Sequence, residues 1–94
     1  MIADVEELKR GVADIVQRII EDLHVDESRP FVWRVIAGEI ERYLRDNALP
    51  ANRVLVAVYC VGLRRNEYEA TVEFWRGDHQ VESFDELWAI LTAP

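Results

Sequence analysis

VLVAVYCVG over residues 54–62 and EYEATVEFW over residues 67–75 decide the fold of this chain. The first run is apolar at both parities and rich in β-branched residues, which predicts a strand that is covered on both faces. In the second run apolar residues alternate with Glu and Thr, except that Trp75 lies on the polar side. This pattern predicts a half-buried strand that pairs with the first run in antiparallel fashion.

Short signals follow the second run. Gly77-Asp78 is a tight-turn signal, which predicts that residues 79–82 return as a short third strand. Ser83, with Glu86 three residues later, fits a capping box and predicts a short C-terminal helix.

Two amphipathic helices are expected before the strands. Apolar residues recur every three or four positions from Ile2 to Leu23, and a second periodic stretch begins at Pro30 and stops before Pro50. The short connector between the helices implies an antiparallel αα-hairpin. We therefore predict one α+β domain over residues 1–94. It consists of the αα-hairpin, a two- or three-stranded antiparallel β-meander and a short C-terminal helix, with helices on one sheet face.

The composition limits the classes of partner. A formal net charge of -7 in 94 residues argues against direct binding to nucleic acid or to an anionic membrane, because both need clustered Lys and Arg. No apolar run is long enough to cross a membrane, and the N-terminus lacks the pattern of a secretory signal. With Cys60 as its only cysteine the chain suits a reducing cytoplasm, and its small size favours a homodimer or another homo-oligomer.

Catalytic signatures are absent from the sequence. It holds no glycine-rich phosphate loop, nucleophile elbow or paired-cysteine metal site, so we expect no enzymatic activity and no cofactor. The best candidate for a metal site is the glutamate stripe at residues 67–73 together with His79. A solvated sheet face is the favoured interpretation of that stripe, since acidic residues opposite a core are routine.

Trp75 is the residue that stands out for binding, because aromatic side chains often anchor interfaces. Either it is covered in an ordinary core or it contacts a partner, and the sequence leaves both interpretations open. Phe31 and Val35 form a smaller apolar strip on the second helix. Acidic residues near these positions suggest a rim for a basic partner. The predicted partner-binding residues are Trp75, Phe31, Val35, Glu69, Glu73, Glu21 and Asp22.

The first hypothesis is therefore a small acidic, non-enzymatic protein–protein interaction module of the adaptor, inhibitor or toxin-neutralising type. The alternative is a small-molecule-binding domain or modest enzyme with a pocket between the helix hairpin and the sheet. The polar candidates for that pocket are Tyr59, Tyr68, His79 and Glu73.

Overall fold

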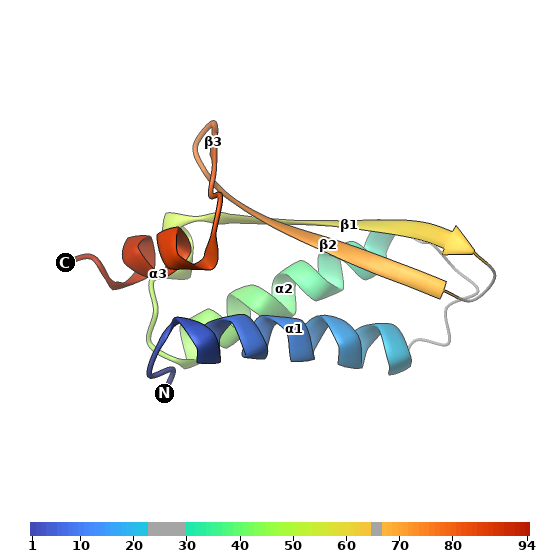
Figure 1. Cartoon of the computed structure of the whole chain (residues 1–94), viewed down its shortest axis with the longest axis horizontal. Helices are drawn as coiled ribbons and strands as arrows, with labels where there is room; N and C mark the ends of the chain where they lie inside the picture. Colours follow the sequence, from blue (N-terminus) through green and yellow to red (C-terminus); the bar gives the residue numbers. More distant parts are fainter. Residues whose placement is uncertain (23–29, 65–66) are drawn as a thin grey trace.

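The computed structural model describes residues 1–22, 30–64 and 67–94, and within these ranges it leaves out the side chains of residues 30–31, 60–64 and 67–69. The predicted α+β order is confirmed (Figure 1). Its elements are α1 (Val5–Asp22), α2 (Pro30–Asp46), the 3-10 turn η1 (Ala51–Arg53), β1 (Leu55–Arg64), β2 (Glu67–Arg76), β3 (His79–Gln80) and α3 (Phe84–Thr92).

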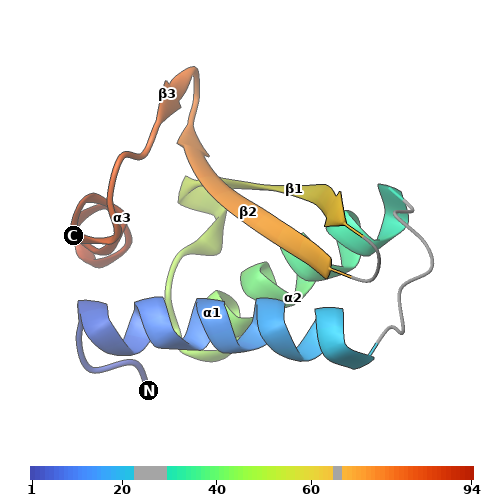
Figure 2. The same cartoon turned by 45° about the vertical axis from the view of Figure 1, so that its right-hand side comes forward.

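The strands form one antiparallel sheet in the order β1-β2-β3, and the helices lie on one side of it (Figure 2). α2 packs beneath β1, and α1 lies beside α2. The N-terminal end of α1 contacts α3. β1 and β2 pair along nearly their whole length, whereas β3 pairs with β2 only at Trp75 and Arg76. The layer of helices therefore covers one face of the sheet, and within residues 1–22, 30–64 and 67–94 nothing lies over the other face.

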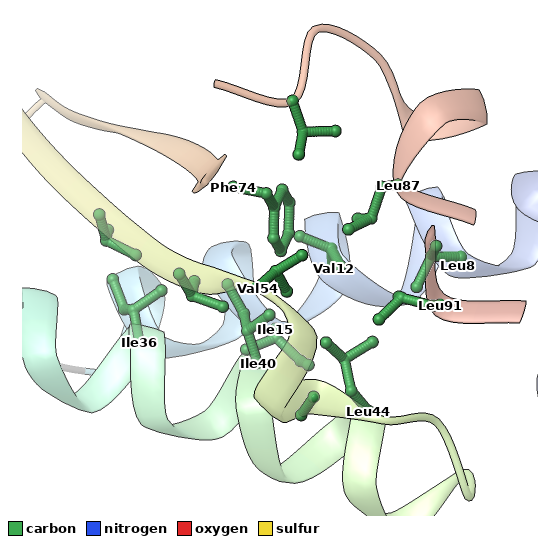
Figure 3. Packing of buried hydrophobic residues seen from close by; sticks show 14 of the residues in the cluster. Leu8, Val12, Ile15, Ile36, Ile40, Leu44, Val54, Phe74, Leu87 and Leu91 are labelled. Carbon is green, nitrogen blue, oxygen red and sulfur yellow. The ribbon is translucent and has the colours of Figure 1, made fainter. Parts of the chain in front are cut away.

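The core lies between the helices and the covered face of the sheet (Figure 3). Every fully buried large side chain is aliphatic, and no buried polar or charged residue is found among the described residues. Phe74 of β2 meets Phe84 of α3 edge to face with ring centroids 6.0 Å apart, which joins the C-terminal helix to the sheet. The fully buried side chains are Leu8, Ile36, Ile40, Leu44 and Leu87.

A Schellman motif ends α2. The Leu49 N–H donates to the Leu44 carbonyl at 2.9 Å, and the Ala48 N–H donates to the Arg45 carbonyl at 3.0 Å. Ala48 takes a φ of 58° to make this turn, a left-handed conformation that glycine usually supplies. The predicted end of this helix before Pro50 is confirmed.

The predicted cap of α3 is confirmed in a slightly displaced form. Ser83 Oγ accepts a hydrogen bond from the Glu86 N–H at 3.1 Å. The Glu86 carboxylate accepts from the Glu82 N–H at 2.8 Å, one residue before the position that the capping box normally uses. Two donors of the first turn region are thereby satisfied by one serine and one glutamate.

A distant arginine binds the other end of α3. Arg53 Nη1 donates to the carbonyls of Ile90 and Ala93, at 3.0 and 2.6 Å. No basic residue lies in the last turn of this helix, so the guanidinium supplies the positive charge that a helix C-terminus favours. The contact fixes α3 against the turn that precedes β1.

One expectation about β1 is wrong. Val56 and Val58 are buried as expected, but Leu55 is 63% exposed and Tyr59 is 48% exposed. The reason is that all three helices lie on the same side of the sheet, so nothing in the described chain covers the second face. Leu55 and Tyr59, at the second parity of β1, therefore face outward.

Candidate functional site

The uncovered face of the sheet carries an aromatic and aliphatic surface. The strand register places Leu55 opposite Trp75 and Tyr59 opposite Thr71. Side chains alternate between the faces of a strand, so residues two apart share a face, and this one is opposite to buried Val56 and Phe74. We call this surface the outer sheet face, and its described members are Leu55, Ala57, Tyr59, Thr71, Glu73 and Trp75.

Trp75 is held in place by its neighbour on this face. Its Nε1 donates to Glu73 Oε2 at 3.1 Å, and the ring lies partly buried on the strand position opposite Leu55. The structure thus places Trp75 outside the core cluster, on the side of the sheet away from the helices. An indole that is already oriented loses less conformational freedom when another surface packs against it.

Glu73 is the only charged member of the outer sheet face as described. It lies opposite Ala57 in the register, within a surface that contains no Lys or Arg. A carboxylate beside two exposed or partly exposed aromatic rings can bind a cation in two ways, by charge pairing and through the ring faces of Trp75 and Tyr59. Arginine suits both, because its planar guanidinium stacks and also donates to carboxylates.

The other predicted binding residues do not join this surface. Val35 is 45% exposed, but it belongs to α2, which lies on the covered side of the sheet. Glu21 and Asp22 are exposed at the end of α1, in the same helical layer. The side chains of Phe31 and Glu69 lie outside the described part of the chain. Of the predicted set, the structure brings together Trp75 and Glu73.

A groove of about 560 Å³ lies between α1 and β2. Its walls are apolar, and the only polar groups that line it are Lys9, Gln17 and Glu21, all from α1. The sequence does not predict which residues line this groove. The lining depends on the distance between α1 and β2, and the periodicity of neither element contains that distance. The apolar lining comes from Ala13, Val16 and Ile20 of α1, Ala70 and Val72 of β2, and Phe84 of α3.

The alternative hypothesis expected a pocket in this region, but with other polar groups. Tyr59 and Glu73 project from the opposite face of the sheet, and His79 lies on the β3 hairpin, so none of them lines the groove. The side chain of Tyr68 lies outside the described residues. The groove therefore offers an apolar wall and a charged rim in place of a cluster of polar catalytic groups.

His79 pairs with α3, while the side chains of Glu67 and Glu69 lie outside the described residues. Its Nε2 lies 2.9 Å from Glu86 Oε1. The pKa of Glu86 is lowered from its ordinary value, first by the hydrogen bond from the Glu82 N–H and then by the contact with His79. Among the described residues no group of three or more His, Cys, Asp or Glu side chains could hold a metal ion.

A second hollow, of about 420 Å³, lies between α1 and α2. Tyr43 lines it, and burial together with the nearby Glu7 carboxylate raises the pKa of its hydroxyl above the ordinary value. The phenol is therefore protonated at neutral pH and does not act as a base there. Its role in the described structure is packing between the two helices.

Comparison with protein-family models, with curated proteins and with solved structures found no match for this chain. Within residues 1–22, 30–64 and 67–94, no helix is both long enough and apolar enough to span a bilayer. A function for this chain is therefore inferred from the geometry of the outer sheet face and of the groove.

Proposed function

We propose that this chain is a non-enzymatic protein-interaction module of the cytoplasm that binds a basic protein partner through its outer sheet face. The observation that carries the proposal is the pairing of exposed Leu55 with Trp75, whose indole is fixed by Glu73. Interface hot spots combine such aromatic anchors with a few oriented polar groups. Adaptor, inhibitor and toxin-neutralising roles would all use this kind of surface.

Three features support a cationic contact on the partner. Glu73 has no basic neighbour within the described outer sheet face, and the chain as a whole has a net charge of -7. The rings of Trp75 and Tyr59 flank the carboxylate position in the register. We therefore expect the partner to present an arginine surrounded by apolar residues, with the arginine between Glu73 and an aromatic ring.

The proposal is tested by capturing partners from the native lysate with the wild-type chain and then measuring the purified pair by calorimetry. Trp75→Ala should weaken binding by about thirtyfold, the effect of losing a hot-spot side chain. Glu73→Gln keeps the shape of the side chain but removes its charge, so it should weaken binding and reduce its dependence on salt.

Val35→Ala is the matched control, because it shortens an exposed apolar side chain on the opposite side of the sheet. It should bind as the wild type does. Each variant is first checked by thermal unfolding, since a Trp75→Ala chain that has lost about 3–5 kcal/mol of stability would assign Trp75 to the core. Equal binding by Trp75→Ala and wild type would contradict the proposal.

A further inference from the structure

The α1–β2 groove lies beside a free strand edge. β1 pairs with one edge of β2. At the other edge the only described strand is β3, whose pairing with β2 extends no further than Trp75. The last bond on that side runs from the Val81 N–H to the Phe74 carbonyl, at 2.8 Å. From Glu67 to Glu73 the edge of β2 above the groove therefore has no paired strand among the described residues.

The backbone groups at this edge can be assigned. The polar groups of a strand alternate between its two edges, and those of Phe74 point to the β3 side. The N–H and C=O groups of Val72 and Ala70 consequently point to the free edge, while their side chains line the groove. A second strand placed here would gain hydrogen bonds and an apolar contact at the same time.

The rim of the groove is complementary to itself. Along α1, Lys9 lies six residues before position 15 and Glu21 lies six residues after it. Ala13 and Gln17 lie two residues before and after the same position. If a second α1 lies antiparallel across this stripe, each Lys9 meets the other copy's Glu21 and each Ala13 meets a Gln17. A two-fold axis makes both charge pairs at once, which is the requirement for an isologous interface.

We propose that a second copy of this chain occupies the groove. The two α1 helices lie antiparallel and cross at the level of position 15, with Lys9 of each copy against Glu21 of the other, and the free edges of the two β2 strands pair around Ala70 and Val72. This surface is separate from the outer sheet face, so the inference does not depend on the proposed partner. The dimer would join two sheets edge to edge and place both outer sheet faces on the same side.

A charge exchange on α1 tests the two-fold arrangement. Lys9 and Glu21 are exposed, so reversing either leaves the fold intact. Lys9→Glu alone should raise the dimer dissociation constant about tenfold, because two attractive pairs become repulsive, and Glu21→Lys alone should do the same. The Lys9→Glu/Glu21→Lys double variant should recover dimerisation. Only a groove that binds its own copy predicts this recovery. The measurement is sedimentation velocity at low salt.

Two substitutions to glutamate separate the groove from the rest of the surface. Ala13→Glu places a charge in the apolar stripe and should give a monomer, whereas Ala89→Glu, at an exposed position on α3 outside the groove, should remain dimeric. Amide hydrogen exchange adds a direct view of the strand edge. Exchange at Ala70 and Val72 should slow as protein concentration rises, while exchange at Thr71, which faces β1, should not change.

A wild-type chain that stays monomeric up to about 1 mM would overturn this inference. So would a dimer that survives Ala13→Glu, or single charge reversals that the double variant does not rescue. Trp75→Ala should leave the dimer intact, and Ala13→Glu should leave contact with the basic partner intact. Failure of one proposal can therefore be told apart from failure of the other.

Discussion

Tyr43 of α2 packs directly against Gly11 of α1, and its hydroxyl fills the space that a β-carbon on residue 11 would need. The pair sets how closely the two helices approach, since a glycine at this position lets an aromatic ring lie against the backbone of α1. Gly38 of α2 is the useful contrast, because a β-carbon there would meet nothing within 4 Å.

Gly11→Ala should destabilise the fold by about 1–3 kcal/mol, because Tyr43 must move out of its place between the helices. Gly38→Ala should instead stabilise the fold by about 0.5–1 kcal/mol, since alanine is the better helix former. Urea unfolding of both variants measures the difference. Adding Tyr43→Phe to Gly11→Ala should recover part of the loss. A stabilised Gly11→Ala chain would show that the helices are not packed in this way.

Ala48→Gly should raise the free energy of unfolding by up to about 1 kcal/mol. Residue 48 has a φ of 58°, which is unfavourable for alanine and free of steric cost for glycine. The control is Ala89→Gly in the middle of α3, which should lower stability by about 1 kcal/mol because glycine is a poor helix former. Thermal unfolding compares the two, and a loss of stability in both variants would argue against the left-handed cap.

Arg53→Met should cost about 1–2 kcal/mol. The substitution keeps much of the aliphatic stem but removes the hydrogen bonds to Ile90 and Ala93 at the end of α3. Arg45→Met is the control, because Arg45 only reaches Glu41 at 3.9 Å on the surface, and its loss should be within about 0.5 kcal/mol. Denaturant unfolding gives both values. If the two variants lose equal stability, the Arg53 contact contributes nothing specific.

Glu86 should make stability fall in acid. Because its pKa is lowered in the folded state, its stabilising contribution is complete above the unfolded value and is lost as the pH falls through the folded value. The wild-type unfolding midpoint should therefore decrease as the pH falls below the ordinary pKa of a glutamate, and Glu86→Gln should show a smaller decrease. Equal acid dependence in the two chains would mean that other carboxyl groups account for the whole effect.

The sequence predicted the elements well because each has a local signal. The helix periodicity, Pro30 and Pro50, and the Gly77-Asp78 turn all act within a few residues of where they occur. No local signal predicts which face of the sheet the helices cover. β1 is apolar at both parities, so only the position of α2 decides that Val56 is buried and Leu55 is exposed.

The site was predictable in part for the same reason. Strand alternation places Trp75 and Glu73 on one face, which the structure shows as a direct hydrogen bond. The groove and the Arg53 contact join segments far apart in the sequence, and their geometry follows from tertiary packing alone. Val35 shares the apolar character of Trp75, but residue type does not tell which side of the sheet a helix occupies.

The wholly aliphatic and aromatic interior has a consequence for how this protein can change over evolutionary time. Among the described residues the interior holds no buried charged residue, and its one buried side-chain polar atom without a hydrogen-bond partner is Trp33 Nε1, so the aliphatic positions have no polar partner of fixed geometry. Volume-conserving exchanges among Leu, Ile and Met should therefore be tolerated at many interior positions. Distant descendants could differ widely inside and still fold alike, and the residues that remain constant between them would mark the surfaces on which selection acts.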